Sequence, residues 1–127
     1  MRKELNTVSV PLGRNYSHAV VSGGLIFTTG QVPVNASGET VGEDLVAQAR
    51  QVFENLQAVL AEAGANLGDV VKTTMYVTDI GSVGLLSELR EEVFGDARPA
   101  SVAIEVPRLW DPQHLIEIEV IAVNAAA

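Results

Sequence analysis

An acidic side chain in an apolar strand is the first feature of the sequence that suggests chemistry. Glu117 lies between Ile116 and Ile118 in a run over residues 115–123 in which apolar residues alternate with others. A carboxylate in such a run costs free energy unless it has a partner or a task. A partly desolvated carboxylate can orient a water molecule for hydrolysis. The alternative is that Glu117 simply faces solvent by strand alternation, as Glu119 would in the same phase.

Groups that could bind a small ligand occur near two other points of the chain. Tyr16 could donate a hydrogen bond to a ligand, or lie at an interface with its hydroxyl in water. His18 would share a face with Tyr16 in a strand; it is a candidate to bind an anionic ligand, unless it is a structural histidine. Thr29 precedes Gly30, a glycine that indicates a backbone requirement and exposed N–H groups. Without that neighbour, Thr29 would be an ordinary β-branched strand residue.

The composition excludes several other kinds of site. The chain has no cysteine, and its two histidines, His18 and His114, lie far apart without ligand spacing, so we expect no metal site. The net charge is −8 and the basic residues are scattered, which argues against nucleic acid as a partner. The basic residues are Arg2, Lys3, Arg14, Arg50, Lys72, Arg90, Arg98 and Arg108. Because neither a signal peptide nor a membrane-spanning run is visible, we expect a cytoplasmic protein that does not bind membranes.

The first half of the chain predicts a hairpin followed by a helix. Residues 19–21 and 25–29 favour strands, and the Ser-Gly-Gly sequence between them is typical of a turn. Thr40 and Glu43 have the spacing of a capping box and predict the start of a helix. Gly64 is placed to end this helix in the left-handed conformation. The apolar stripe of the helix consists of Leu45, Ala49, Val52, Phe53, Leu56, Val59, Leu60 and Ala63.

The second half predicts a strand, a helix and two further strands. Residues 70–78 are rich in β-branched residues and alternate. The residues expected on one face of this strand are Val71, Thr73, Met75 and Val77. A turn leads to a helix over residues 83–94, which a Gly and Pro segment ends. Strands follow over residues 101–106 and 115–123, and a further short strand is predicted near residues 7–10.

These elements predict one α+β domain over residues 1–127, with a six-stranded mixed sheet and two helices on one face. No element remains to cover the other face of the sheet. Apolar residues on that face would need a partner chain, so we expect an oligomer. A chain of 127 residues is also small for enclosing a large pocket, which favours a pocket between subunits.

Six segments in order along the chain carry a resemblance to a known family. They are Tyr16-Ser17-His18-Ala19, Thr28-Thr29-Gly30-Gln31-Val32-Pro33, Ala47-Gln48-Ala49-Arg50-Gln51 with Asn55-Leu56, Gly68-Asp69-Val70-Val71-Lys72-Thr73-Thr74, Arg98-Pro99-Ala100 and Ile116-Glu117-Ile118-Glu119. With these segments the chain resembles the reactive-intermediate deaminase (Rid) family over nearly its whole length. The resemblance implies a chorismate-mutase-like fold and a homotrimer with a cleft at each subunit interface. It also implies hydrolysis of small reactive enamines or imines to release ammonia, with no cofactor and no metal.

The resemblance also assigns roles to individual residues. Glu117 matches the glutamate that positions the attacking water, and Tyr16 matches a tyrosine of the cleft. Thr29 keeps a hydroxyl where many members have serine. Gly30 and Gln31 match the segment that lines the cleft and are expected to contact the substrate.

Two positions expected to line the substrate site depart from the family pattern. Ser101 stands where deaminase members carry an arginine that grips the substrate carboxylate, and a serine cannot replace that charge. Ala103 stands where a cysteine is frequent, which matters less because not every active member has one. Arg14 and Arg98 are candidates to restore the charge, unless each is a solvated surface charge. The sequence therefore predicts a substrate that is uncharged near the imine, or one whose acid group binds elsewhere.

Two hypotheses of different classes follow for the function. The first is a Rid-like hydrolase of a small enamine or imine, in which Glu117 and a water do the chemistry. The second is a non-catalytic trimeric module that binds a small metabolite in the same cleft. Loss of the arginine favours the binding module, whereas retention of Glu117 and Tyr16 favours the enzyme. Ribonuclease activity, which some relatives are reported to have, fits poorly with a net charge of −8.

Overall fold

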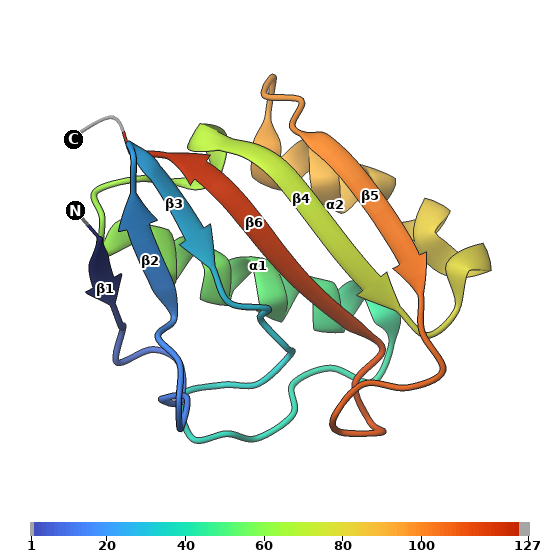
Figure 1. Cartoon of the computed structure of the whole chain (residues 1–127). Helices are drawn as coiled ribbons and strands as arrows, with labels where there is room; N and C mark the ends of the chain where they lie inside the picture. The colour runs from blue at the N-terminus through green and yellow to red at the C-terminus, as the bar shows by residue number, and fades with distance from the viewer. Residues whose placement is uncertain (1, 125–127) are drawn as a thin grey trace.

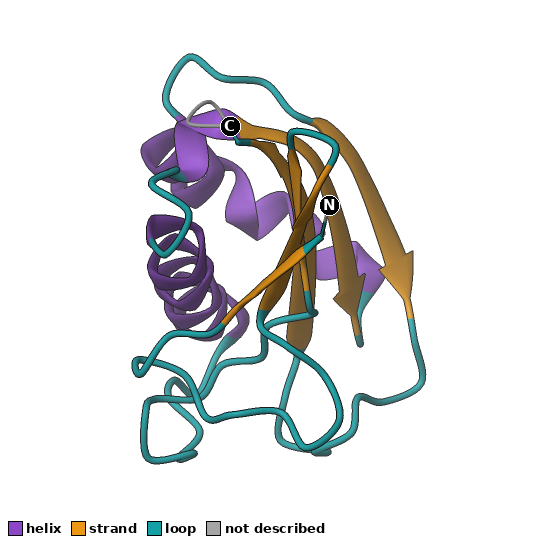
Figure 2. Cartoon of the chain, turned by 60° about the vertical axis from the view of Figure 1, so that its left-hand side comes forward, coloured by secondary structure: helices purple, strands orange, loops and turns teal. Residues whose placement is uncertain are grey.

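One six-stranded sheet with the two α-helices on one face forms the computed structural model, which describes residues 2–124 (Figure 1; Figure 2). In chain order the elements are β1 (Lys3–Leu5), β2 (Ala19–Ser22), β3 (Leu25–Thr28), α1 (Leu45–Ala61), the 3-10 helix η1 (Leu67–Asp69), β4 (Val70–Val77), the 3-10 helix η2 (Ile80–Leu86), α2 (Ser87–Phe94), β5 (Ala100–Glu105) and β6 (Ile116–Val123). The predicted α+β fold is confirmed. The two ends of the predicted domain, residue 1 and residues 125–127, lie outside the described residues.

The last strand of the chain lies in the middle of the sheet. The strand order is β1-β2-β3-β6-β4-β5. Neighbouring strands in this sheet are antiparallel, except for the parallel pair of β4 and β5. A parallel pair needs a crossover connection, which η2 and α2 provide. In this order β6 lies between β3 and β4, and β5 forms an edge of the sheet (Figure 1).

Alternation along β6 separates the two faces of the sheet. Ile116, Ile118 and Val120 are at most 2% exposed and belong to the core beneath α1, which lies behind β6 in Figure 1. Fully burying a side chain of this size stabilises the fold by about 1.5–3 kcal/mol. The rings of Phe53 in α1 and Phe94 in α2 meet edge to face, with centroids 5.5 Å apart, so both helices join the same core.

The first helix is capped by Asp44 and not by the predicted capping box. The Asp44 side chain accepts a hydrogen bond from the Ala47 N–H at 2.9 Å, so α1 begins at Leu45. The prediction that Thr40 and Glu43 start the helix is therefore wrong. Thr40 instead forms an isolated antiparallel bridge with Val34, and this bridge closes the loop between them.

The end of α1 follows the prediction closely. Gly64 has a φ of 74°, the left-handed conformation that glycine adopts at little cost. The Gly64 N–H donates to the Ala61 carbonyl and the Ala65 N–H to the Leu60 carbonyl, both at 3.0 Å. This pair of hydrogen bonds satisfies carbonyls that the helix end would leave unpaired.

A bulge changes the predicted faces of β4. The pairing with β6 shifts between Val70 and Lys72, so the alternation changes phase at that point. Val71 is 44% exposed, and the prediction that it shares the buried face of Thr73 and Met75 is wrong.

The short strand predicted near residues 7–10 lies elsewhere. The first strand is β1, over Lys3–Leu5, which pairs with β2. Thr7 lies just before a turn at Val8 and Ser9, and its N–H donates to the ring of His18 at 3.0 Å, which holds the backbone away from a ladder.

The helix predicted over residues 83–94 begins earlier, at Ile80, and its first part is a 3-10 helix. Asp79 caps the 3-10 helix η2 by accepting a hydrogen bond from the Gly81 N–H at 3.0 Å. The α-helix itself starts only at Ser87, and Gly95 follows its end with a φ of 59°. Within residues 2–124, no helix combines the length and the apolar character needed to cross a membrane.

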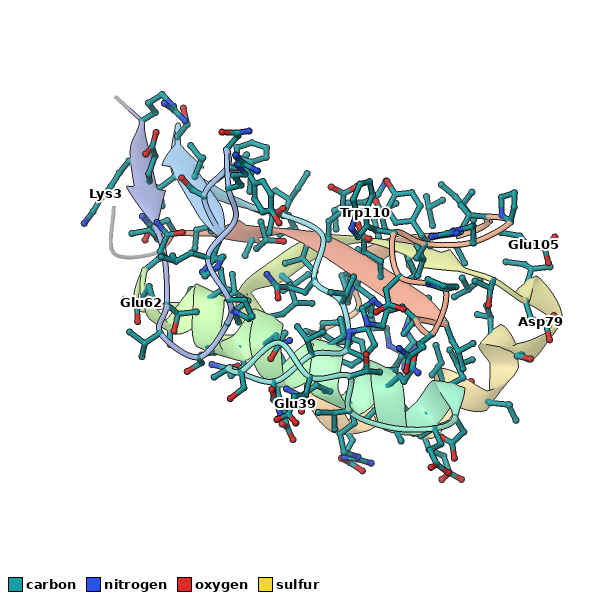
Figure 3. All side chains as sticks on the ribbon, turned by 90° about the horizontal axis from the view of Figure 1, so that it is seen from below. Lys3, Glu39, Glu62, Asp79, Glu105 and Trp110 are labelled. Atoms are coloured by element: carbon teal, nitrogen blue, oxygen red, sulfur yellow. The ribbon has the colours of Figure 1, made fainter. Side chains whose placement is uncertain are left out.

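The face of the sheet opposite α1 carries apolar side chains that no other element within residues 2–124 covers. Phe27, Val102 and Ile104 are each 41–42% exposed on this open face. Trp110, in the loop before β6, is 95% exposed and lies on the side of the sheet away from α1 (Figure 3). Such a surface favours association with another protein chain.

Candidate active site

The chain leaves β3 at a corner where Glu117 lies against Gly30. Just beyond this corner, the Gln31 N–H donates to the Ile118 carbonyl at 2.8 Å, and the Ile118 N–H donates back at 3.1 Å. This bridge sets Gly30 alongside Glu117 on the open face. A Cβ atom on Gly30 would overlap the Glu117 carboxylate and lie 2.8 Å from its Cδ. A larger residue at position 30 would therefore force the Glu117 carboxylate to move.

Beside this corner lies a hollow of about 130 Å³, which Tyr16, His18, Thr29, Gly30 and Gln31 help to line and Glu117 does not. Gln31 is only 3% exposed, and it pairs with the core residue Ile118. Tyr16 is 61% exposed, and its ring lies where a Cβ on Gly13 would be. Thr29 is half-buried, and its N–H donates to the His18 carbonyl at 2.9 Å. We call Tyr16, Thr29, Gly30, Gln31 and Glu117 the Glu117 corner. The corner offers a ligand two hydroxyl groups and a carboxylate.

Burial and a nearby carboxylate raise the pKa of Glu117. The larger cause is desolvation, and the second is the charge of Glu119, two residues further along the same face of β6. On β4, Tyr76 is the register partner of Glu117. The Tyr76 hydroxyl donates to Glu119 Oε1 at 2.7 Å, and this hydrogen bond is the main reason that the pKa of Tyr76 is raised. A carboxyl group with a raised pKa is a better proton acceptor near neutral pH.

Tyr76 was not among the residues predicted for the site. Tyr76 follows the β-branched residues of its strand and gives no signal by itself. Its importance arises from the antiparallel register between β4 and β6, which places it opposite Glu117.

His18 has a structural role, although it also lines the hollow beside Tyr16. It is 1% exposed, whereas Tyr16 is mostly exposed, and neither lies in a strand. The Thr7 N–H donates to His18 Nδ1 at 3.0 Å, so Nε2 carries the ring proton and donates to the Pro11 carbonyl at 2.8 Å. Both ring nitrogens are therefore occupied, and the imidazole joins the N-terminal loop to the sheet.

Ser101 and Ala103 do not lie with the Glu117 corner. They pair in register with Thr73 and Met75 on β4, both at most 1% exposed in the core under the helices. Their side chains therefore point to the helix side of the sheet, whereas Glu117 points to the open side. Within one chain, the two groups of predicted site residues lie on opposite faces of the sheet.

An arginine that the sequence analysis did not consider contacts Ser101. The Arg90 guanidinium, from α2, donates to Ser101 Oγ at 2.9 Å, and Thr73 Oγ1 donates to the same oxygen at 3.0 Å. Arg90 forms no ion pair with another described residue. Arg98 lines a neighbouring hollow with Arg90, whereas Arg14 lies beside Tyr16. We call Ser101, Ala103 and Arg90 the Ser101 edge.

Two buried polar residues of α1 hold the loops that frame the Glu117 corner. Asn55 is 3% exposed, and its Nδ2 donates to the carbonyls of Val32 and Val34 at 3.1 and 2.9 Å. Gln48 is 2% exposed; it donates to the Gln113 carbonyl at 3.0 Å and accepts from the Leu115 N–H at 2.8 Å. Their amides satisfy loop groups that would otherwise be buried without partners.

The loop before β6 supplies no ligand cluster. His114 is buried beside Thr40, with 3.1 Å between Nε2 and Oγ1, and desolvation lowers its pKa, partly offset by Asp111. Among residues 2–124, no three His, Asp or Glu side chains gather in a way that would hold a metal ion.

The chain is similar to known proteins over nearly its full length. A sequence model of the family described as endoribonuclease L-PSP matches residues 8–124. A RutC family protein of Pyrococcus abyssi is 45% identical over 113 residues, which cover 88% of this chain and 87% of that protein. The 2-iminobutanoate/2-iminopropanoate deaminase of Salmonella typhimurium is 38% identical over 129 residues, covering 98% of this chain and 99% of the relative.

A solved structure shares the fold. The crystal structure of YyfA of Yersinia pestis, described as a protein of unknown function of the conserved Rid protein family, has a TM-score of 0.91 at 33% identity and covers 97% of this chain and 99% of its own. The sheet with two helices on one face therefore defines the chain as an α+β protein of the L-PSP type. The chain belongs to the Rid family, and the family predicted from the sequence is confirmed.

Proposed function

We propose that this protein is a hydrolase of small reactive enamines or imines that releases ammonia. The observation that carries the proposal is the Glu117 carboxylate, which lies against Gly30, a residue that lines a hollow together with Tyr16 and Thr29. A relative that matches nearly the whole chain is named 2-iminobutanoate/2-iminopropanoate deaminase, which supports the same class of reaction.

Glu117 moves the proton in the proposed reaction. It takes a proton from a water while the water oxygen bonds to the imine carbon. The electron pair of the C=N bond moves to the nitrogen, which receives a proton. Glu117 then passes the proton of the carbinolamine hydroxyl to the nitrogen, so that the C–N bond breaks, a carbonyl forms and ammonia leaves. The raised pKa of Glu117 suits a group that both accepts and returns a proton. The hydroxyls of Tyr16 and Thr29 orient the substrate.

Each complete site is formed by two chains in this proposal. The Glu117 corner and the Ser101 edge point away from opposite faces of one sheet, so one chain cannot place both around one small molecule. In a cyclic homotrimer, the corner of one chain meets the edge of the next, which gives one cleft per interface. The half-exposed Phe27, Val102 and Ile104 on the open face support such an assembly.

Arg90 gives the Ser101 edge a positive charge. Its guanidinium lies 2.9 Å from Ser101 Oγ and can form a charged hydrogen bond to a carboxylate in the cleft. The Arg90 side chain extends toward Ser101 from α2, whereas an arginine at position 101 would extend from β5 itself. The substrate range is therefore shifted toward imines whose acid group lies further from the reacting carbon.

A non-catalytic module that binds a small metabolite in the same cleft is the alternative. The exposed hydroxyls of the corner and the Ser101 edge would serve a binder equally well. A binder has no need of a desolvated carboxylate held against a glycine, which is why the enzyme is favoured. The net charge of −8 argues against an RNA substrate, although the family's sequence model carries an endoribonuclease description.

Ammonia release from freshly generated imines tests the proposed function. The panel contains 2-aminoacrylate, longer imino acids and imines without a carboxylate, each measured with wild type, Glu117→Gln and Ser101→Arg. Glu43→Gln serves as the matched control, because Glu43 is exposed and lies outside the corner. Acceleration of at least one imine that Glu117→Gln abolishes and Glu43→Gln keeps would support the enzyme. If no imine is accelerated while the protein is folded and oligomeric, the binding module replaces the enzyme.

A further inference from the structure

A hydrogen bond between two side chains crosses from β4 to β6 on the open face, beside the Glu117 corner. Tyr76 lies in register opposite Glu117, but its hydroxyl donates to Glu119 Oε1 at 2.7 Å. Thr74, the register partner of Glu119, lies on the same face. The hydrogen bond therefore runs diagonally across the strand pair and fixes the Glu119 carboxylate in one position.

The charges around Glu117 explain why that position matters. Glu119 is a like charge on the same strand, and Tyr76 is the titratable group that faces Glu117 from β4. From the segment after β3, Gly30 contributes only backbone. The nearest cation on this face of β4, Lys72, pairs in register with Ile121, four residues beyond Glu117. Lys72 also lines a hollow with Glu119, but the two form no ion pair among the described residues, so Glu119 stays a like charge beside Glu117.

We propose that Tyr76 is a positioning residue for the reaction, whose hydroxyl holds the Glu119 carboxylate close to Glu117 and so keeps Glu117 a strong proton acceptor. The inference rests on the proposed function for its consequence, but not for its geometry. Like charges in proximity favour the protonated form of one of them. If Glu119 were free to turn toward solvent, its effect on Glu117 would weaken, because exposed charges are screened.

A titration of Glu117 in the assembled protein tests the inference without substrate. Carboxyl 13C resonances are recorded against pH in wild type, Tyr76→Phe, Glu119→Gln and the double variant, with Glu117→Gln to assign the signal. Tyr76→Phe removes only the hydroxyl and is expected to move the Glu117 midpoint to lower pH. Glu119→Gln is expected to move it in the same direction, and adding Tyr76→Phe to Glu119→Gln is expected to cause no further shift. The acid limb of kcat/KM should move with the midpoint in each variant.

The outcomes separate this inference from the proposed function. An unchanged Glu117 midpoint in folded Tyr76→Phe overturns the inference. The inference also fails if Tyr76→Phe shifts the midpoint equally in wild type and in Glu119→Gln, because Tyr76 would then act on Glu117 without Glu119. If the midpoints shift as expected but no imine is hydrolysed, the positioning stands and the proposed function fails. If imines are hydrolysed and the midpoints do not shift, the proposed function stands and the positioning fails.

Discussion

The Glu117 corner is built on the interior strand β6, whereas the Ser101 edge lies on the edge strand β5. The corner is fixed by the bridge from Gln31 to β6 and by Asn55 from α1. The edge lies on β5, which pairs only with β4, and its charge comes from Arg90, a long and partly exposed side chain. A group that moves protons needs a fixed position, while a group that recognises a substrate can tolerate adjustment. The difference indicates chemistry at the corner and substrate selection at the edge.

The largest expected effect comes from filling the corner. Gly30→Ala places a Cβ in the space of the Glu117 carboxylate, which must move to another position. Because a displacement of about 1 Å can lower a rate by about 100-fold, we expect a loss of kcat/KM on that order. Gly84→Ala is the matched control, since its Cβ would have no neighbour within 4 Å. Steady-state kinetics that show equal activity for both variants would contradict a fixed carboxylate.

Removing the support behind the corner should cost stability. Asn55→Leu leaves the carbonyls of Val32 and Val34 without their donor, at a cost of about 1–3 kcal/mol for buried polar groups. Chemical denaturation measures this loss, and hydrogen exchange should increase in residues 31–42. Gln57→Leu, which removes a hydrogen bond to the Leu67 N–H on the other side of the helix, is the comparison. Unaltered exchange in residues 31–42 would mean that α1 does not hold the corner.

Changing Arg90 at the Ser101 edge should lower kcat/KM only for imines that carry a carboxylate. Arg90→Ala is expected to lower kcat/KM about tenfold for imines with a carboxylate, the cost of one charged hydrogen bond of roughly 1.5 kcal/mol, and to leave neutral imines unchanged. Arg50→Ala, which breaks an exposed ion pair with Glu92, is the control. An equal loss for charged and neutral imines would show that Arg90 does not select the substrate.

The smallest expected effect is a gain of stability at the corner. The pKa of Glu117 is raised above its ordinary value of 4.5, so the folded protein binds this proton more tightly than the unfolded chain. Ionised Glu117 therefore lowers stability once the pH rises above 4.5, and fully so above the folded pKa. Glu117→Gln should raise Tm at neutral pH by a few degrees at most, and not below the unfolded pKa. A lower Tm at neutral pH would contradict a desolvated carboxylate.

The elements of the fold could be predicted because periodicity is local. The alternation of β6 and the stripe of α1 follow from spacing alone, and both match the buried positions. Val71 was misplaced because a bulge depends on the partner strand, and the pairing that creates it lies about 50 residues away. The start of α1 was misplaced because Thr40 and Asp44 both suit a cap, and tertiary contacts of the preceding loop decide between them.

The candidate site could be predicted only where sequence neighbours act together. Thr29, Gly30 and Gln31 are consecutive, and Glu117 lies beside them through one bridge. Arg90 could not be found, since its approach to Ser101 depends on how α2 packs on β5. Gln48 and Asn55 did carry a signal, because they are polar residues that lie close to the apolar stripe of α1 and are buried. Their partners, however, are loops whose course the sequence does not give.

Complementation between two defective chains tests most directly whether one corner and one edge from different chains make each site. Glu117→Gln and Arg90→Glu are purified separately, shown to be inactive on an imino acid, then unfolded, mixed in equal amounts and refolded together. If a site takes its corner from one chain and its edge from the next, random assembly restores roughly a quarter of the sites. Activity near that fraction of wild type is the predicted result. A mixture no more active than the two variants refolded alone would contradict the account.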